Sequence, residues 1–309
     1  MPKFITRAEQ LTKTIQSIST SHSEKELSQA KSRSRLVLFI VFLICEGMII
    51  ILGSNYFEIF PTNKNLAYNL VIAVVFLLSS MWLKRIERWN HYWRIAYAFF
   101  IGSVAFPSTL LLDKWINRLI SVLGFPANNS PGLAIEKICE MMVIVVPILL
   151  LTKLSGSDLG SIYLKRGNLK LGLGVGLLVF LFLATAAFTF GAQRFTSLNT
   201  LSAAVVWGLI FSTANGFMEE LWLRGIFLKR FEPILGINLS VLLTSIVFAL
   251  MHGFAFYFIP AALPFFVLNT LALGVACGYL MMKSDSVWGS TLIHTASDFF
   301  LFLAVFANA

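Results

Sequence analysis

Long apolar stretches recur along this chain and limit what it can fold into. Nine stretches approach the ~20 residues that a helix needs to cross a bilayer. They are centred on residues 36–54, 66–83, 93–112, 132–152, 171–191, 201–228, 238–257, 262–282 and 287–307. Hydrophobic residues make up 57% of the chain, charged residues 13%, and the mean hydropathy is +0.80. The sequence therefore predicts an all-α polytopic membrane protein with eight to nine transmembrane helices, and not a soluble domain.

Basic residues are distributed unevenly between alternate loops. Of the 24 Lys and Arg residues, 18 fall in the N-terminal segment or in the loops after the second, fourth, sixth and eighth stretches. Because cytoplasmic loops carry the excess of Lys and Arg, we expect a cytoplasmic N-terminus and an external C-terminus in a cell membrane. The net charge of +9 then reflects topology and contact with anionic membrane lipids, not nucleic-acid binding.

Three segments divide the chain by composition. Residues 1–35 are polar and hold no apolar run that could serve as a signal peptide. We expect them to form a cytoplasmic N-terminal segment, residues 36–195 to form N-terminal transmembrane helices, and residues 196–309 to form the functional core. The three cysteines lie in separate apolar stretches, so we expect ordinary small apolar residues without a disulfide framework.

Ionisable residues stand inside the apolar stretches of the last third of the chain. Each costs at least ~2.5 kcal/mol to insert into a bilayer, so such residues are partnered or used. Glu220 and Arg224 are one helical turn apart, which predicts an ion pair and leaves Glu219 free to point into a cavity as a candidate base. In the alternative interpretation, all three form one buried ionic lock between helices.

Two of the four histidines fall in apolar stretches of the same region. His252 alone resembles the packing histidines that are common in apolar helices. His294 and Asp298 are one turn apart, so the carboxylate either orients the imidazole or lines the same cavity. The clustering of these residues near the two glutamates favours a shared site.

These residues resemble a family: the CPBP intramembrane proteases, or Abi family, which include the type 2 CAAX prenyl proteases. The motifs are EExxxR from Glu219 to Arg224, FxxxH from Phe248 to His252 and Hxxx(N/D) from His294 to Asp298. Residues 273–294 are similar to the glycine-rich helix, turn and final helix of that family, and residues 155–176 to the entry of its core. The resemblance covers about the last third of the chain.

The resemblance implies an enzyme with a C-terminal four-helix catalytic core that hydrolyses a peptide bond in a membrane-associated or lipidated peptide or protein. In it, Glu219 is the general base, His252 shares the water or binds a metal, and His294 with Asp298 stabilises the oxyanion. Many members have asparagine at the position of Asp298. Because a carboxylate donates to an oxyanion only when protonated, Asp298 orients His294 in the alternative interpretation.

The cofactor is left open by the sequence. A glutamate and two histidines, here Glu219, His252 and His294, are a ligand set known for catalytic zinc. The three residues come from separate stretches without a compact HExxH spacing, so no local segment encodes a metal site. In the metal-free version Glu219 acts directly as the base.

Several alternatives to a protease site are also left open. The runner-up function is a non-catalytic membrane protein that binds a partner in immunity or regulation, or a proton-linked carrier.

Two pairs of glycines, Gly172-xxx-Gly176 and Gly274-xxx-Gly278, predict close helix packing, although a substrate groove beside Gly274 is the alternative. Glu46, near the middle of the first stretch, needs a polar partner that the sequence does not identify. Oligomeric state is not indicated.

Overall fold

The computed structural model describes residues 32–54, 61–125, 129–191, 195, 197–255 and 263–306. Within these ranges the chain forms helices and no strand, which confirms the all-α prediction for them. The chain divides into two compact units, Met1–Phe42 and Leu43–Ala309. A helix over residues 32–50 begins in the first unit and ends in the second. The first 31 residues, where a cytoplasmic segment is predicted, lie outside the described residues.

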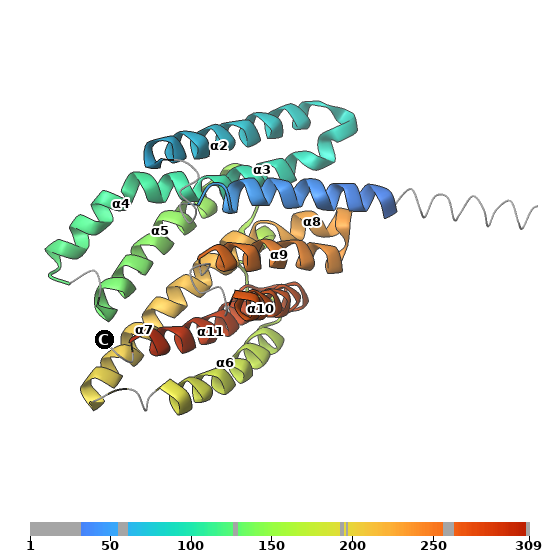
Figure 1. Cartoon of the computed structure of the whole chain (residues 1–309). Helices are drawn as coiled ribbons and strands as arrows, with labels where there is room; N and C mark the ends of the chain where they lie inside the picture. Colours follow the sequence, from blue (N-terminus) through green and yellow to red (C-terminus); the bar gives the residue numbers. More distant parts are fainter. Residues whose placement is uncertain are drawn as a thin grey trace, which may run out of the picture. The chain divides into compact units, whose positions relative to one another are not determined.

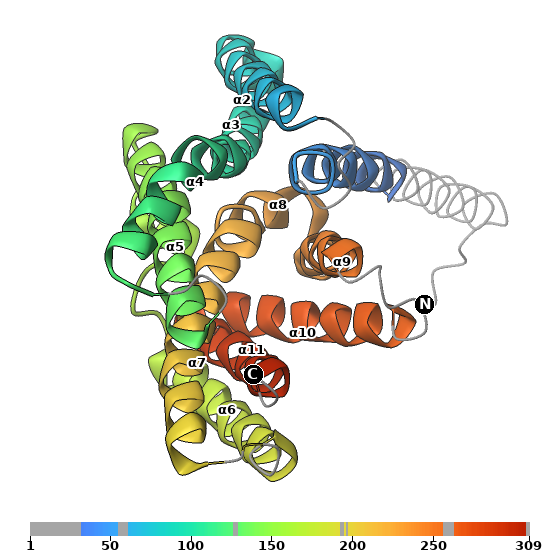
Figure 2. The same ribbon diagram turned by 60° about the vertical axis from the view of Figure 1, so that its left-hand side comes forward.

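The first helices of the second unit pack as a group before the chain reaches the site (Figure 1). They are α2 (Thr62–Arg85), the 3-10 turn η1 (Glu87–Tyr92), α3 (Trp93–Ser103), α4 (Ala105–Val122) and α5 (Ser130–Leu154). Asn129 caps α5 by accepting a hydrogen bond from the amide of Gly132, and a proline follows the cap within the first turn. Because α5 contacts both α4 and α7, it joins this group to the later helices (Figure 2).

The remaining helices surround the ionisable residues. They are the 3-10 turn η2 (Leu159–Ile162), α6 (Leu169–Gly191), α7 (Leu198–Glu219), the π-helical turn η4 (Glu220–Gly225), α8 (Leu228–Leu235), α9 (Ile237–Ala255), α10 (Leu263–Ser284) and α11 (Trp288–Phe306). Helix α11 packs against both α6 and α7, and α10 packs against α9. One buried apolar cluster, which includes Tyr163, Val241 and Met281, ties η2 to α9 and α10.

Each of the nine predicted stretches coincides with helix in the described residues, but the count of nine spans is not confirmed. Six segments of the described chain are long and apolar enough to cross a membrane. Helices α3 and α4 fall within one such segment, Glu87–Val122, and α7 to α8 fall within another, Leu198–Leu235. Helix α5 is not among these six segments, and it carries three charged residues within its apolar length, Glu136, Lys137 and Glu140.

Glycines allow close contact between helices at the predicted small-residue patterns. A Cβ at Gly176 would lie 2.8 Å from the carbonyl oxygen of Gly289, so α6 and α11 touch backbone to backbone. A Cβ at Gly274 would lie 3.0 Å from the Cβ of Ser245 on α9 and 3.0 Å from Nη2 of Arg224. Packing therefore fills the space beside Gly274, which favours the packing interpretation over the groove.

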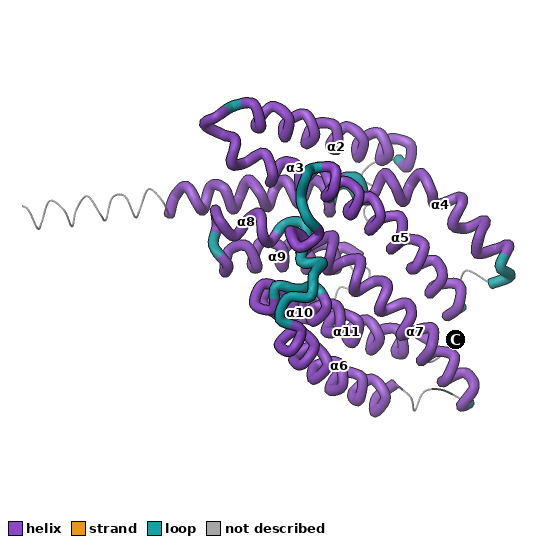
Figure 3. Tube along the Cα trace, turned by 180° about the vertical axis from the view of Figure 1, so that it is seen from behind, coloured by secondary structure: helices purple, strands orange, loops and turns teal. Residues whose placement is uncertain are grey.

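The loops that the sequence predicts to share one side of the membrane meet at one end of the second unit. Asp285, between α10 and α11, forms ion pairs with Lys165, before α6, and with Lys229, at the start of α8. Burial disfavours the ionised Asp285, but its hydrogen bonds to both lysines outweigh that effect and lower its pKa. The amide of Val287 also donates to the carbonyl of Tyr163 at 3.0 Å. The connection between α5 and α6 is drawn as a long loop in Figure 3.

Candidate active site

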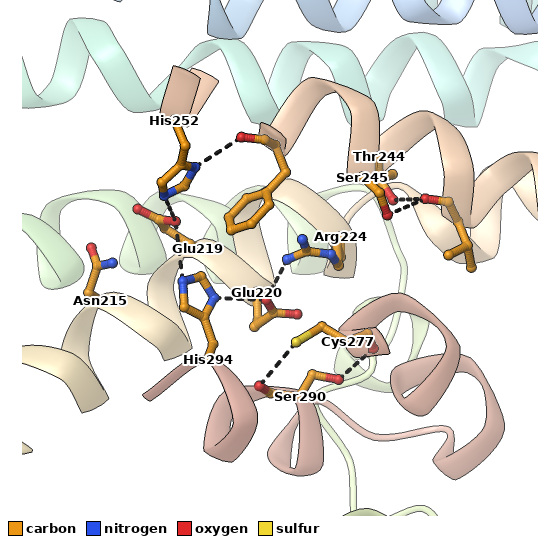
Figure 4. A network of polar contacts seen from close by, with 12 residues as sticks. Asn215, Glu219, Glu220, Arg224, Thr244, Ser245, His252, Cys277, Ser290 and His294 are labelled. Atoms are coloured by element: carbon orange, nitrogen blue, oxygen red, sulfur yellow. Dashed lines mark hydrogen bonds and ion pairs between the residues drawn. The ribbon is translucent and has the colours of Figure 1, made fainter. Parts of the chain in front are cut away.

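The two glutamates lie where the α-helix α7 changes to the π-helical turn η4. Helix α7 begins after Ser197, whose hydroxyl accepts a hydrogen bond from the amide of Thr200, and ends at Glu219. Glu220 is the first residue of the wider π-helical turn. Single π-helical turns inside α-helices occur frequently at functional sites. Adjacent residues of a helix point about 100° apart, so the two carboxylates take different directions within one buried region (Figure 4).

Glu220 and Arg224 form the predicted ion pair, and both side chains are fully buried. The same Oε1 atom of Glu220 also lies 2.9 Å from Nδ1 of His294. The guanidinium of Arg224 stacks over the ring of Phe248 at 4.3 Å. Glu219 has the imidazoles of the site as its neighbours instead, so the three residues do not form a single ionic lock.

His252 is oriented by its own helix, α9. Its Nδ1 lies 2.9 Å from the carbonyl oxygen of Phe248, four residues earlier. A carbonyl oxygen only accepts hydrogen bonds, so Nδ1 donates to it and Nε2 is left to face the site. The ring of Phe248 also packs against both imidazoles, with centroid distances of 4.3 Å to His252 and 5.4 Å to His294. This geometry gives the spacing of the FxxxH motif a physical reason.

The two imidazoles present Nε2 to one oxygen of Glu219 (Figure 4). Nε2 of His252 and Nε2 of His294 each lie 3.6 Å from Oε2 of Glu219. Glu219 Oε2 and His294 Nε2 are buried and have no hydrogen-bond partner among the described residues. A buried polar atom without a partner is costly, and such atoms are expected where a ligand or a water binds. The three side chains therefore enclose a common point for chemistry.

Asp298 lies on the same side of His294, but it is not the closest group that orients the imidazole. Its Oδ1 is 3.6 Å from Nε2 of His294, beyond hydrogen-bond distance, whereas Glu220 contacts Nδ1 at 2.9 Å. Asp298 Oδ2 accepts a hydrogen bond of 2.9 Å from the side-chain amide of Asn215. The sequence analysis did not single out Asn215, although it lies one turn before Glu219 and faces the same region.

Comparison with known proteins gives the family of this region. Residues 201–300 match the family model described as type II CAAX prenyl endopeptidase Rce1-like. This third of the chain is therefore similar to the CAAX proteases. The family is one of proteases, and the matched residues include every one of the six site residues predicted from the motifs. A search of curated proteins gave no match, and a search of solved structures gave none.

The donor atoms of this candidate site suit a zinc ion chemically. Neighbouring ligands of a tetrahedral zinc stand ~3.3 Å apart when metal–ligand distances are near 2 Å, close to the 3.6 Å separations around Glu219 Oε2. The Nδ1 of His252 faces a carbonyl and that of His294 a carboxylate, as second-shell partners do in metal sites. No group of three His, Cys, Asp or Glu residues in the described chain is close enough for a fully formed metal site.

The structure also places the other ionisable residues of the apolar stretches. Lys137 pairs with Glu140 at 2.5 Å, as their spacing predicts. Glu46 is buried, its Oε1 has no hydrogen-bond partner among the described residues, and it interacts electrostatically with Arg224. Arg224 is therefore the polar group near Glu46 that the sequence did not identify. The three cysteines are free, as predicted.

An apolar cavity of about 820 Å³ lies between α5, α6, α7 and α11. Thr213, Ala214 and Phe217 of α7 line it, immediately beside Asn215 and one turn before the glutamates. The other walls are mostly aliphatic and aromatic, with Leu173 and Trp288 among them. The cavity is large enough for an extended hydrocarbon group.

Proposed function

We propose that this chain is an intramembrane endopeptidase that hydrolyses a peptide bond in a membrane-associated or lipidated peptide or protein. The observation that carries the proposal is the convergence of Glu219 Oε2 with the Nε2 atoms of His252 and His294, each at 3.6 Å. A water held there has a carboxylate to take its proton and two imidazoles to orient it. Such a set provides the general base that peptide hydrolysis requires.

Glu219 is the general base in this proposal, and Glu220 is a positioning residue. Glu220 holds Nδ1 of His294 through its Oε1, and Arg224 in turn holds Glu220. With its Nδ1 fixed, His294 presents Nε2 to the reacting group, and as an imidazolium it donates the Nε2–H to negative charge that develops there. The buried position of this network excludes bulk water, which strengthens each electrostatic interaction.

Asn215 and Asp298 form a carboxylate–amide pair beside His294 in the proposed mechanism. Many relatives have an asparagine at the position of Asp298, and the amide of Asn215 lies 2.9 Å from Asp298 Oδ2. An amide N–H can donate to an oxyanion, whereas an ionised carboxylate cannot. We assign the oxyanion donor to the Asn215 amide together with His294, and the positioning of that amide to Asp298.

Zinc is the open part of the mechanism. The chain offers Glu219, His252 and His294 as the residues that would hold the ion. A bound zinc would lower the pKa of a coordinated water and polarise the scissile carbonyl. In the metal-free version the same Glu219 takes the proton of the water directly. Both versions require these three side chains, so metal dependence is a question for experiment.

Cleavage by purified full-length protein tests the proposal. A library of quenched peptides, with and without lipid anchors, is incubated with wild type, Glu219→Gln and the control Glu87→Gln in detergent. Glu87 is exposed in η1, away from the site. We expect wild type and Glu87→Gln to cleave equally and Glu219→Gln to lose at least about 100-fold in rate, the size expected for a lost general base. Equal cleavage by Glu219→Gln would overturn the assignment of the base.

The same assay decides between the two versions of the chemistry and tests the substrate class. Loss of cleavage with a chelator and its recovery with zinc would select the zinc version, whereas full activity in the chelator would select the metal-free version. The apolar cavity beside α7 favours lipidated peptides, so we expect their KM to be the lower. Absence of cleavage across the lipidated library would reject the protease in favour of the binding role.

A further inference from the structure

A second cavity, of about 460 Å³, lies at the end of the protein where the basic loops meet, and it is separate from the candidate active site. Its wall is formed by η1, the start of α3, the loop around η2, and α8. The polar side chains on it are His91, Arg94, Ser157, Ser161, Lys229 and Arg230. Among the described residues that line it, none is an aspartate or a glutamate. The charged side chains that line this cavity are therefore all basic.

The two arginines of this cavity lack acidic partners in the described chain. Nη1 of Arg230 donates to the carbonyl oxygens of Ile226 at 2.7 Å and of Ser161 at 3.4 Å, and neither carbonyl carries a charge. Arg94 stacks near the ring of Trp93 at 5.4 Å and is exposed. The two guanidinium charges interact repulsively. Lys229 differs, because Asp285 neutralises it at 2.5 Å.

Two like charges that face one partly buried space are stabilised by an anion placed between them. Guanidinium groups bind phosphate oxygens through paired N–H donors, which makes phosphate the anion that suits two arginines best. The Ser157 hydroxyl and the His91 ring add further hydrogen-bonding groups at the wall. The cavity volume is sufficient for a phosphate ester with part of its attached group.

The position of the cavity along the helices favours a membrane lipid as the source of the phosphate. Arg94 lies near the start of the candidate span Glu87–Val122, and Arg230 near the end of the candidate span Leu198–Leu235. Trp82 and Trp89 pack together at 5.4 Å beside this end and are 54% and 39% exposed. Exposed tryptophans are enriched at the level of the lipid headgroups, so the arginines lie at that depth as well.

We propose that this cavity binds the phosphate of an anionic membrane phospholipid, with Arg94 and Arg230 as the phosphate ligands. This proposal is independent of the proposed protease function, because none of the residues of the cavity belongs to the network around Glu219. Basic pockets at the ends of transmembrane helices bind lipid headgroups by the same chemistry. Bound lipid would stabilise the folded protein by an amount that grows with the logarithm of the lipid concentration above its Kd.

Lipid binding to the full-length protein in neutral detergent tests the proposal. Phosphatidylglycerol is titrated into mixed micelles, and native mass spectrometry counts bound lipids while thermal unfolding reports stabilisation. The variants are Arg94→Gln, Arg230→Lys and the control Lys170→Gln. Lys170 is an exposed residue at the start of α6 and does not line the cavity, so the control removes one positive charge outside the site. Phosphatidylcholine with the same acyl chains and inorganic phosphate alone are the ligand controls.

We expect one phosphatidylglycerol to bind saturably, with an apparent affinity weakened at least about tenfold by Arg94→Gln and within about twofold of wild type in Lys170→Gln. Arg230→Lys keeps the charge but loses the planar fork, so we expect an intermediate loss. Arg94 makes no buried contact, so its variant stays informative if Arg230→Lys unfolds. Equal losses in Arg94→Gln and Lys170→Gln, or no saturable binding, would overturn the site. Arg94-dependent stabilisation by inorganic phosphate alone would overturn the lipid as its ligand.

Discussion

Adjacent carboxylates at positions 219 and 220 differ in what surrounds them. Glu220 is fully buried, and its Oε1 contacts both a guanidinium and an imidazole nitrogen. Glu219 faces two Nε2 atoms at 3.6 Å and has an oxygen without a hydrogen-bond partner in the described chain. One carboxylate is therefore held by the fold, and the other is available for chemistry. The difference predicts that the two residues respond differently to the same substitution.

Glu220→Gln should unfold the protein more readily than Glu219→Gln does. The first substitution leaves Arg224 buried beside a neutral amide, and breaking a buried ion pair from one side costs about 3–5 kcal/mol. The second leaves that pair intact. Thermal unfolding of both variants in the same detergent checks this expectation. A Glu219→Gln variant that melts as low as Glu220→Gln would mean that Glu219 is also structural.

Asp298→Asn should retain most activity, whereas Asp298→Ala should lose it. An asparagine at 298 can still accept through its carbonyl oxygen from the amide of Asn215 and adds a second amide near His294. Alanine removes the acceptor and releases Asn215, for which we expect at least a tenfold loss in kcat/KM, roughly the effect of a misplaced oxyanion donor. Rates on one peptide substrate at fixed pH provide the measurement. If both variants lost activity equally, the carboxylate charge itself would be required.

Residue roles were predictable where they depend on spacing along one helix, and not where they depend on contact between helices. The Glu220–Arg224 pair follows from a separation of four residues. The contact between Glu220 and Nδ1 of His294 joins residues 74 positions apart, so no local pattern encodes it. Asn215 was missed for the same reason, although an amide one turn before Glu219 was a usable signal.

At the scale of elements, contact between α6 and α11 places His294. The two helices approach closely at Gly289, because a Cβ there would lie 2.4 Å from the carbonyl oxygen of Gly172. Five residues later α11 presents His294 to Glu219 and Glu220. The helix contact thus sets the depth and the rotation of α11. Substitutions at Gly289 should act on the site through this packing.

Gly289→Ala should destabilise the protein, and Gly174→Ala should not. The added methyl group at 289 meets the α6 backbone, which cannot move as a side chain can, and overpacking of this kind costs about 1–3 kcal/mol or more. Gly174 lies on α6 with nothing within 4 Å of its Cβ direction, so alanine gains up to about 1 kcal/mol of helix propensity. Thermal unfolding compares the two. Equal stability of both variants would contradict this account of the α6–α11 contact.

Helix existence was largely predictable from apolar length, whereas helix breaks were not. The expected stretch 93–112 is interrupted between α3 and α4 at Val104; Pro107 cannot donate a hydrogen bond to the carbonyl of Ser103 at this break, but apolar length does not reveal it. The π-helical turn after Glu219 likewise has no signature in composition. Apolar length alone therefore gives the helical fold class but not the number of spans.

At the scale of the whole molecule, alternation of basic loops agrees with the geometry. Four basic loops come together at one end of the second unit: those before α3, before α6, at the start of α8 and between α10 and α11. The arginine cavity, lined by Arg94 and Arg230, and the ion pairs of Asp285 connect them. Figure 1 places the turn between α2 and α3 at the end opposite to the C-terminal end of α4. Which end faces the cytoplasm is a prediction from charge alone.

Labelling of single cysteines should place the ends of these helices on opposite sides of the membrane. In a variant with Cys45, Cys139 and Cys277 replaced, Lys114→Cys on α4 and Lys170→Cys at the start of α6 are introduced one at a time; both native side chains are exposed. A membrane-impermeant maleimide added to intact cells should label position 114 and reach position 170 only after permeabilisation, because the basic loops face the cytoplasm. Labelling of position 170 alone in intact cells would reverse the orientation, and equal labelling of both would contradict their placement at opposite ends. A cytoplasmic position 170 would also place the arginine cavity on the inner leaflet, where anionic lipids provide the phosphate that Arg94 and Arg230 require.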